Sequence, residues 1–327
     1  MYEINDPSGK RMFIPETPSE DPPYFHPDSL ESAVQYYKDN GYVVIRNVVE
    51  HELLDQINNA FDEEILKYDG YFYRQTGGNP EKNKYNKDGQ LINPILNIHD
   101  LLTKKTKKFR DSGLKILTDD FVKKFSTVLF GEDPIMVQSM YFHGNTETWA
   151  HQDSYYLDSE NFGSMFAIWV AAEDILPGAG RFFIYPKSHK LGLMKNTGHL
   201  SVSNNHNEYK NAIIRWMDDN KLECKAPALN KGDILIWNGN TVHGSLKTTM
   251  SGSSRRSLTA HYIKRGDKFI QFHSREIKLN LSKFNDMEIH SPKTLNSLKR
   301  KVILAVEITF PKTFQWLKWR AVKFFTK

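Results

Sequence analysis

The chain has 327 residues, 39% of them hydrophobic and 13% aromatic, a composition ordinary for a folded globular protein that excludes general disorder. A single cysteine, Cys224, excludes an intramolecular disulfide framework and a cysteine-rich zinc site, so a metal would be held by His and carboxylate side chains. The N-terminus has no apolar signal segment, and no run approaches the roughly 18 apolar residues that span a bilayer. These features predict a cytoplasmic protein.

The net charge of +5 is distributed unevenly. Residues 293–327 contain nine Lys or Arg and one Glu, a surplus of +8, which leaves the other 292 residues at 5 − 8 = −3. The pattern predicts a basic amphipathic helical tail over residues 291–327, with Phe314 and Leu317 on its apolar face. Such a tail either docks on the core of the protein or lies on an anionic membrane surface. No extended basic surface elsewhere suggests nucleic-acid binding.

The first part of the chain is expected to be mainly helical. Residues 1–28, rich in Pro, Asp and Ser, predict an extended arm. Helical periodicity and β-rich composition then predict the following elements: helices over 29–40, 50–68 and 118–131, a strand over 42–49, and a polar loop over 69–95.

The texture changes after residue 131 to short β-rich runs separated by Gly, Pro and Asn, which favours a sandwich or barrel. Strands are predicted over 135–142, 164–174, 180–186, 233–238 and 256–263. The expected fold is therefore mainly β with flanking helices. The helical front part would cover residues 29–131 and the β core residues 132–265, within one domain over 29–290.

Inside this β core, the stretch "TWAHQDSYY" places His151 and Asp153 two positions apart. In a strand these side chains would point to one face, with Gln152 pointing away. His243, just after a strand and a Gly/Asn turn, is a candidate third ligand. Two His and one carboxylate on one side of a metal are typical of non-haem Fe(II) oxygenases. In a chain with 12 His, however, such a pair also arises by chance, and a structural histidine is the alternative interpretation.

An arginine at the start of the strand "RRSLTAHYI" strengthens the metal hypothesis. Arg offers a planar, permanently charged fork for bidentate binding of a carboxylate. An iron oxygenase that uses 2-oxoglutarate needs such a group, because the cosubstrate chelates iron through one end and leaves a distal carboxylate to be neutralised.

Several segments together resemble the phytanoyl-CoA dioxygenase (PhyH) family of Fe(II)/2-oxoglutarate-dependent oxygenases over most of residues 35–265. The similar segments are "GYVVIRNVVEHELL", "WAHQDSYY", "FAIWVAAEDILPGAGRFFIYPKSHK", "GDILIWNGNTVHGS" and "RRSLTAHYI". Each segment alone is a modest match to the family, but the order and spacing of the five together are specific to it. The resemblance implies a double-stranded β-helix, a jelly-roll or cupin-like fold, with helices packed outside.

The resemblance also implies roles for individual residues. His151, Asp153 and His243 match the iron ligands, and Arg255 matches the residue that pairs with the distal carboxylate of 2-oxoglutarate. The loop after His243 is slightly longer than in the family, which leaves Arg256 as a rival. Counting back from "HYI" favours Arg255, because residues 255, 257, 259 and 261 then share a face.

Two further polar positions match cosubstrate contacts in the family. Ser245 matches a hydroxyl that often helps to hold the distal carboxylate, and Gln138 matches a position that often contacts the cosubstrate. A polar residue at a sheet edge explains Gln138 equally well. With these parts, the family couples oxidative decarboxylation of 2-oxoglutarate by O2, giving succinate and CO2, to oxidation of a substrate C–H bond. Because Asp153 is present, hydroxylation, desaturation or ring closure is favoured over halogenation.

Candidate substrate residues are Tyr155, Tyr156, Trp169 and Arg181, which are expected to line or border the cavity. For the aromatic residues core packing is the leading alternative, and for Arg181 a surface position. The loop 69–95 and the stretch 195–216 have the character of lids.

Three hypotheses follow from the sequence: an oxygenase of a small, perhaps anionic, metabolite; the same chemistry on a membrane-associated lipid-linked sugar or acyl compound; and a jelly-roll module that binds without catalysis.

Overall fold

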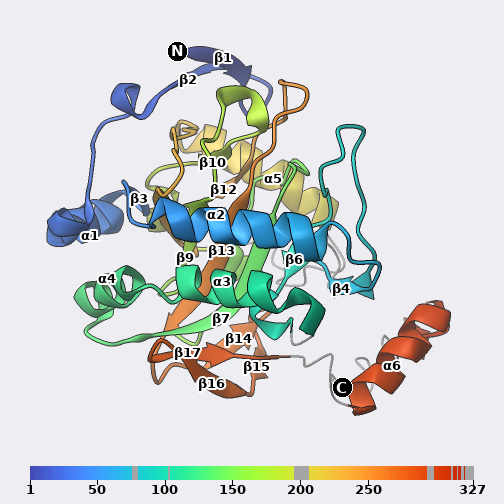
Figure 1. Ribbon diagram of the computed structural model, residues 1–327. Coiled ribbons are helices and arrows are strands. Elements are labelled where there is room, and N and C mark those ends of the chain that lie inside the picture. The colour runs from blue at the N-terminus through green and yellow to red at the C-terminus, as the bar shows by residue number, and fades with distance from the viewer. Residues whose placement is uncertain are drawn as a thin grey trace.

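A computed structural model of the chain describes residues 1–75, 80–101, 104–194, 206–292, 298–310, 312–314, 316–317 and 320. Its centre is a large mixed sheet with the strand order β16-β17-β7-β13-β9-β11-β3 (Figure 1). A short strand, β6 (Ile95–Leu96), also pairs with β7. The bounds of the other seven are β3 Tyr42–Ile45, β7 Pro134–Phe142, β9 Phe166–Ala171, β11 Ile234–Asn238, β13 Ser257–Lys264, β16 Leu281–Phe284 and β17 Met287–His290.

Shorter strands form the opposing layer of the jelly roll. They are β8 (Leu157–Ser159), β14 (Phe269–Gln271) and β15 (Arg275–Ile277) in one group, and β10 (Phe182–Ile184) with β12 (His243–Ser245) in the other. The predicted fold class, mainly β with flanking helices, is confirmed. The sheet extends beyond the expected core of residues 132–265, because β3 joins one edge, and β16 and β17 continue it beyond β7.

Side chains of the central strands point alternately to the two faces of the sheet. One face, the structural face, packs in the hydrophobic core, and the other, the functional face, lines a cavity. Leu258, Ala260 and Tyr262 of β13 belong to the largest hydrophobic cluster. Thr259 and His261, which alternate with them, line a cavity on the other face. Both faces of these strands are buried, and β9, "FAIWVA", is a continuous apolar run.

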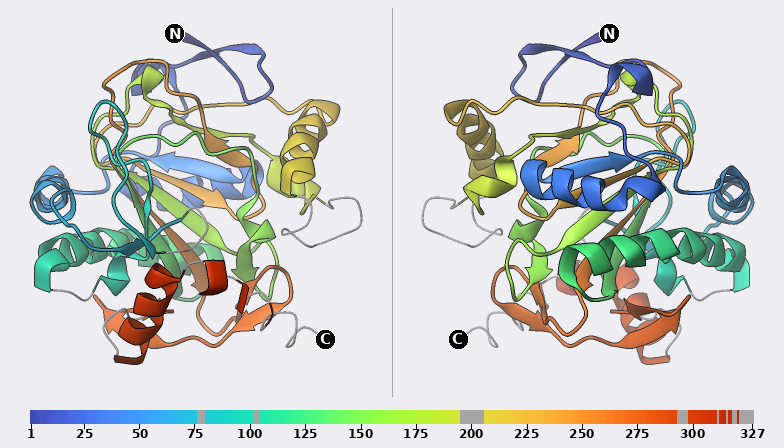
Figure 2. Two further views of the ribbon diagram at one scale, coloured as in Figure 1. Left: turned by 90° about the vertical axis from the view of Figure 1, so that its right-hand side faces the viewer. Right: turned by 90° about the vertical axis from the view of Figure 1, so that its left-hand side faces the viewer.

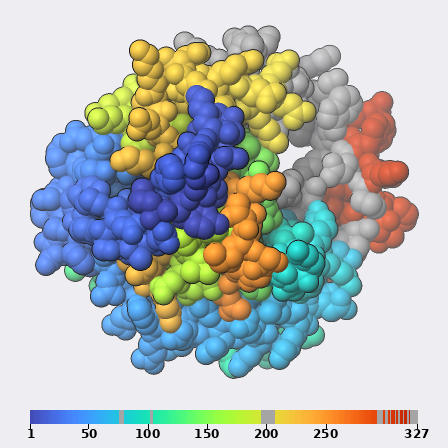
Figure 3. Space-filling model, turned by 90° about the horizontal axis from the view of Figure 1, so that it is seen from above, coloured from blue at the N-terminus to red at the C-terminus, as the bar shows by residue number. Residues whose placement is uncertain are grey.

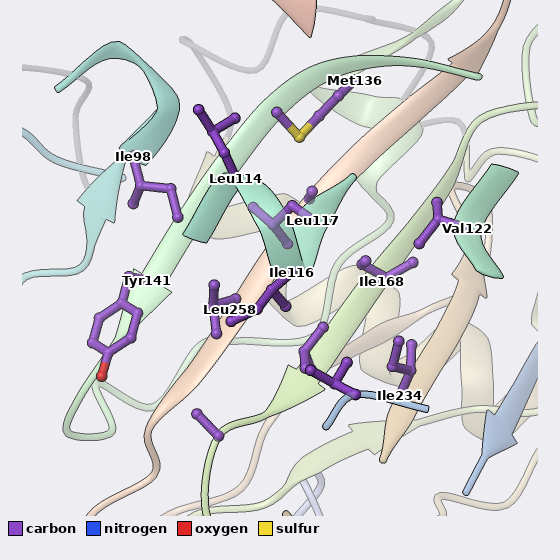
Figure 4. Close-up of a cluster of buried hydrophobic side chains, with 14 of the residues drawn as sticks. Ile98, Leu114, Ile116, Leu117, Val122, Met136, Tyr141, Ile168, Ile234 and Leu258 are labelled. Carbon is purple, nitrogen blue, oxygen red and sulfur yellow. The ribbon is translucent and has the colours of Figure 1, made fainter. Parts of the chain in front are cut away.

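Helices cover the structural face of the sheet. Leu114 and Leu117 of α3 (Lys107–Leu117) and Val122 of α4 (Asp120–Phe130) pack against side chains of the central strands (Figure 4). The helix α1 (Leu30–Asn40) ends at Gly41, whose φ of +78° suits glycine. The predicted helix 50–68 is α2 (His51–Ala60) continued by a π-helical turn, Phe61–Ile65. Helix α3 was not predicted.

Helix α5 (His206–Asp219) lies on the other side of the sheets from α2 and α3 (Figure 2). Tyr209 of α5 stacks on Tyr155 with ring centroids 4.1 Å apart, and its hydroxyl accepts a hydrogen bond from the Gln152 amide. Residues 195–205 of the predicted lid lie outside the described residues, whereas residues 206–216 of it are helical.

The N-terminal segment is a hairpin and not the extended arm that was predicted. Strands β1 (Tyr2–Asn5) and β2 (Arg11–Ile14) pair in antiparallel register, and Ile4 and Ile14 are buried in a second hydrophobic cluster. The hairpin lies across the end of the jelly roll (Figure 3), where the Tyr2 hydroxyl is 2.9 Å from Thr249 Oγ1. The Pro-rich composition that suggested an arm is concentrated after residue 14, and the short alternating runs before it form the strands.

The loop 69–95 is organised by short strands, β4 (Phe72–Tyr73) and β5 (Pro80–Glu81). At the other end of the chain, α6 (Leu298–Thr309) lies at the periphery of the molecule (Figure 1). This helix lies within the tail predicted over 291–327, of which residues 293–297, 311, 315, 318–319 and 321–327 lie outside the described residues. No helix in the described part of the chain is long and apolar enough to cross a membrane.

Candidate metal centre

His151 and His243 face each other across an antiparallel bridge. Each donates its amide to the carbonyl of the other, with N···O distances of 2.9 and 3.0 Å. Side chains directly opposite one another in such a pair point to the same face. Their imidazole rings are accordingly 4.3 Å apart between centroids, on the cavity side.

Asp153 joins them from a turn and not from a regular strand, since it begins a 3₁₀ turn over Asp153–Tyr155. Its Oδ1 is 3.4 Å from His151 Nε2, and its Oδ2 is 3.6 Å from His243 Nε2. One ligand atom from each of the three residues lies within 4.8 Å of the others. As predicted, Gln152 points away, and its amide nitrogen donates to the carbonyls of Gly192 and Asn240.

Hydrogen bonds to the main chain orient both imidazoles toward this point. His151 Nδ1 is 2.9 Å from the carbonyl of Trp149, and His243 Nδ1 is 2.9 Å from that of Thr241. Because a carbonyl only accepts, each Nδ1 carries the proton. Each Nε2 therefore presents its lone pair to the cluster, the arrangement that fixes metal-binding histidines.

The electrostatics of the three side chains also suit metal binding. Burial lowers the pKa of His243 to about 4, so its ring is neutral at physiological pH. Burial alone would raise the pKa of Asp153, but the adjacent His243 and His261 bring that pKa well below its usual value. A neutral imidazole and an ionised carboxylate are the forms that ligate metals. The donor set fits Fe(II), with three protein ligands on one side.

Arg255 lies in the same cavity and is 2% exposed. Its guanidinium sits over the rings of Phe142 and Trp169, and no described carboxylate lies within ion-pair distance of it. Its buried Nε has no hydrogen-bond partner. Burial lowers its pKa to about 10, so it remains a cation at neutral pH. A buried cation without a protein partner points to an anionic ligand.

The rival Arg256 is otherwise engaged. Its guanidinium donates to both oxygens of Asp62, at 2.9 and 3.1 Å, outside the cavity lining. Ser245 lines the cavity, and its hydroxyl accepts a hydrogen bond from the Thr148 amide at 2.7 Å. Gln138 is half-buried on β7 opposite His261 but is not part of the cavity lining.

The predicted substrate residues separate into two groups. Trp169 lines the cavity. Tyr155 is fully buried against α5, and Tyr156 is half-buried with its ring 5.9 Å from that of His151; neither belongs to the lining. Arg181 is neither on the surface nor at the cavity.

The placement of Arg181 corrects its expected position near the substrate. Its Nε donates to the carbonyl of Ile175 at 3.0 Å, and its terminal nitrogens donate to the carbonyls of Pro15 and Glu16. The side chain is 2% exposed. Its donors therefore tie the segment after the N-terminal hairpin to the jelly roll.

Two residues at the centre were not predicted. Trp237 Nε1 donates to Asp153 Oδ2 at 2.8 Å, and His261 Nε2 lies 3.2 Å from the same oxygen. His261 could have been found from the alternation that places residues 255, 259 and 261 on one face of β13. Trp237 follows an apolar run, where packing is the usual role of a tryptophan.

A jelly roll that brings two histidines, one carboxylate and a buried unpaired arginine into one cavity defines the class of non-haem Fe(II)/2-oxoglutarate-dependent oxygenases. Comparison with known proteins agrees. The sequence profile of phytanoyl-CoA dioxygenase (PhyH) matches residues 37–257, and the chain belongs to this family. The predicted membership, enzyme class and cofactors, Fe(II) and 2-oxoglutarate with O2, are thus confirmed.

Curated relatives carry the name phytanoyl-CoA dioxygenase domain-containing protein 1. The chain is 24% identical over 261 residues to the protein from Danio rerio, covering 70% of this chain and 88% of that one. The homolog from Dictyostelium discoideum is 27% identical over 272 residues, covering 71% and 90%. The match to the Rattus norvegicus protein, 30% identical over 135 residues, spans 40% of this chain and 45% of that protein.

Solved structures with the same fold include two proteins of nogalamycin biosynthesis. The carbocyclase SnoK has a TM-score of 0.55 at 18% identity, covering 79% of this chain and 90% of its own. The epimerase SnoN has a TM-score of 0.54 at 14% identity, covering 75% and 87%. At these identities the similarity establishes the fold alone.

Proposed function

We propose that the chain oxidises an unactivated C–H bond of a small anionic metabolite, with His151, Asp153 and His243 as the Fe(II) ligands and Arg255 as the residue that binds 2-oxoglutarate. The single observation that carries the assignment of the cosubstrate is the buried guanidinium of Arg255, which has no described carboxylate partner and lies in the cavity of the three metal-ligating side chains. When bound, Fe(II) with 2-oxoglutarate and O2 supplies the oxidising chemistry, and succinate and CO2 are released.

The protein's part in this reaction is to hold and shield its reactants. His151 and His243 offer Nε2 lone pairs, and Asp153 offers a negative charge. The planar fork of Arg255 matches the two oxygens of a distal carboxylate, and the Ser245 hydroxyl is available to donate to the same group because it accepts from the Thr148 amide. Trp169 and Phe142 exclude water around the guanidinium, which strengthens its attraction for an anion.

Lys210 supports the anionic character of the substrate. Its Nζ lies 3.9 Å from the ring centroid of Trp149, the residue whose carbonyl binds His151. It is half-buried, and none of the described carboxylates lies within ion-pair distance of it. A cation held over an aromatic ring near the metal ligands is available to an anionic group of a substrate.

The first experiment is anaerobic addition of Fe(II) and 2-oxoglutarate to the apo-protein, with absorption spectroscopy in the visible range. We expect a weak metal-to-ligand charge-transfer band that is absent from His151→Ala. Absence of the band from the folded wild type would refute the oxygenase and leave the non-catalytic binding module. Succinate formation with a panel of carboxylates, phosphates and uncharged analogues then tests the substrate class. Lys210→Met should lose the preference for anions, and an unchanged preference would contradict its role.

The exposed face of α6 supports a second candidate, in which the substrate is a lipid-linked sugar or acyl compound at a membrane. Leu298, Val302 and Val306, four residues apart along the helix, are 81%, 58% and 43% exposed, and Phe310 is 60% exposed. They lie within the segment 293–327 that carries the surplus of +8. Apolar side chains among basic ones are the features that bind an anionic lipid surface.

Vesicle co-sedimentation tests this candidate. The full chain should pellet with vesicles of phosphatidylcholine and phosphatidylserine and less with phosphatidylcholine alone, because each Lys or Arg near an anionic surface contributes about 1 kcal/mol. The double variant Val302→Asp/Val306→Asp should stay in the supernatant. Val128→Asp, at a 37% exposed valine of α4, is the matched control and should behave as wild type. Equal pelleting of all three proteins, or none with either vesicle, would exclude the membrane-bound substrate.

A further inference from the structure

The two oxygens of Asp153 have different surroundings. Oδ2 lies 2.8 Å from Trp237 Nε1 and 3.2 Å from His261 Nε2. Oδ2 also lies 3.6 Å from His243 Nε2, whereas Oδ1 has neither donor beside it and lies 3.4 Å from His151 Nε2. All these side chains are buried or nearly so, which makes their hydrogen bonds strong and their loss costly.

An indole N–H is only a donor, so Trp237 donates to Oδ2. His261 must also donate from Nε2, since a lone pair at that position would face the lone pairs of a carboxylate oxygen. Its Nδ1 is buried and has no hydrogen-bond partner. An unprotonated Nδ1 costs less there than a buried N–H without an acceptor. Both considerations place the proton of His261 on Nε2.

A carboxylate oxygen has two in-plane lone pairs. The two N–H donors beside Oδ2 match its two lone pairs in number, which leaves Oδ1 as the oxygen available to a metal. We infer that Trp237 and His261 are positioning residues that confine Asp153 to coordination through one oxygen. This inference rests on the proposed function, because it takes Asp153 as a ligand of the metal.

Coordination of Asp153 through one oxygen affects how many positions on the metal are left for other ligands. A carboxylate that bound through both oxygens would occupy two positions of the metal. If Asp153 and the two histidines each supplied one donor atom, the side of the metal that faces the cavity would stay available to the cosubstrate and to a further small ligand. The pair thus preserves the open side of the site.

The placement of both residues fits this role. His261 lies on β13, between β7 and β9, opposite Gln138 on one side and Ala167 on the other. Trp237 lies on β11, opposite Ala167 on β9. The two rings meet edge to face, with centroids 6.1 Å apart. Because both donors come from paired central strands, they hold the carboxylate, which itself comes from a turn.

The test uses His261→Phe, which removes the donor, and His261→Gln, whose amide nitrogen can still donate. Trp237→Phe removes the other donor, and Trp169→Phe is its matched control, since Trp169 lines the same cavity without a hydrogen bond to Asp153. The measured quantities are the dissociation constant for Co(II) or Fe(II), without substrate and under anaerobic conditions, and the thermal midpoint of each apo-protein.

We expect His261→Phe and Trp237→Phe to bind metal about 10- to 100-fold more weakly, the usual effect of removing a residue that orients a metal ligand. His261→Gln should remain within about threefold of wild type, and Trp169→Phe should match wild type. Wild-type metal affinity in folded His261→Phe or Trp237→Phe would overturn the inference. So would equal weakening in His261→Gln and His261→Phe, which would indicate packing. Should His261→Phe not fold, Trp237→Phe against Trp169→Phe decides alone.

Failure of the proposed function gives a different result. The wild-type protein would then bind neither metal nor 2-oxoglutarate, and no charge-transfer band would form. A band in the wild type together with unchanged metal affinity in the variants refutes only the positioning role.

Discussion

Replacing Arg255 with Met should change cosubstrate binding and protein stability in opposite directions. Arg255 is 2% exposed, stacks near Phe142 and Trp169, and has no described carboxylate partner. Met has a similar length and no charge, so it should fill the same space against the two rings. What it removes is the ability to bind an anion.

The loss of cosubstrate affinity can be worked out from the hydrogen bonds. A bidentate pair between guanidinium and carboxylate contains two charge-assisted hydrogen bonds, each contributing about 1.5–3 kcal/mol. Their removal costs about 3–6 kcal/mol, and since each 1.4 kcal/mol is tenfold, the Kd for 2-oxoglutarate should rise about 10²- to 10⁴-fold. Arg255→Lys keeps the charge but loses the fork, and should weaken binding about tenfold.

The stability of the apo-protein should rise in the same variant. A buried cation without a partner is costly, and exchange of buried ionic groups for apolar side chains of similar volume often stabilises a protein by about 1–4 kcal/mol. Thermal unfolding of Arg255→Met without ligands should therefore occur at a higher temperature than that of wild type. Addition of metal and 2-oxoglutarate should raise the wild-type midpoint much more than that of the variant.

The assay combines the charge-transfer titration with thermal unfolding, with and without 2-oxoglutarate. Arg256→Met is the matched control, because Arg256 binds Asp62 at the edge of the molecule. It should keep the affinity for 2-oxoglutarate and lose a little stability. A Kd for 2-oxoglutarate in Arg255→Met within about threefold of wild type would refute the reasoning. A rise of about 10²- to 10⁴-fold in the Kd of Arg256→Met would instead assign cosubstrate binding to Arg256.

Three further predictions address metal binding, pH and the N-terminal segment. Asp153→Asn should bind Fe(II) more than about 100-fold more weakly in the same titration, since loss of an outer partner alone costs about 10- to 100-fold; near-wild-type affinity would exclude Asp153 as a ligand. Burial lowers the pKa of His99 from 6.5 to about 4, so as pH falls through this window the unfolded state takes up the proton first and the free energy of unfolding should drop by about 3 kcal/mol. His99→Gln should flatten this part of a denaturant-derived stability profile, and an unchanged slope would contradict it. Arg181→Met removes the donors to the buried carbonyl of Ile175 and to the part-buried carbonyls of Pro15 and Glu16, and should lower stability by about 2–4 kcal/mol and expose the N-terminal hairpin to limited proteolysis; cosubstrate affinity should be retained, and its loss together with a resistant hairpin would refute the structural role.

Much of the fold was predictable because the central strands have a strong local signal. The runs over 135–142, 233–238 and 256–263 correspond closely to β7, β11 and β13. Helix α3 escaped prediction because the buried face of "KKFRDSGLKIL" includes Ser112 and Gly113, and glycine is a poor helix former. A Cβ at Gly113 would lie 2.6 Å from Ile98 Cδ1, so a larger residue there would require the Ile98 side chain to shift, and a contact of this kind exists only in the folded protein.

The ligand set was predictable to a similar degree, and for a related reason. His151 and Asp153 are close in sequence, and the strand before His243 has a clear pattern. The sequence did not show the register in which the segments of His151 and His243 pair. The bridge that sets His151 directly opposite His243 joins residues 92 positions apart in number, and a shift of one residue would turn one imidazole to the other face.

The arginines show most clearly why the rest of the site required the structure. Arg74, Arg181 and Arg255 are all buried, and residue type gives each the same donors. Arg74 donates to the carbonyls of Glu81 and Asn93 and to the Asn83 side chain, and Arg181 to three carbonyls.

Of these three, Arg255 alone has no main-chain or side-chain acceptor in the described part of the chain, and it lies beside the metal-ligating residues. Sequence can indicate that an arginine is suited to bind a carboxylate. Whether its donors are already used depends on carbonyls that come from distant segments, as Pro15 and Glu16 do for Arg181. A buried arginine whose N–H donors have no protein acceptor is therefore suited to bind the cosubstrate, whereas a structural arginine has its donors already bonded. Comparing Arg255→Met with Arg181→Met tests this distinction within one protein.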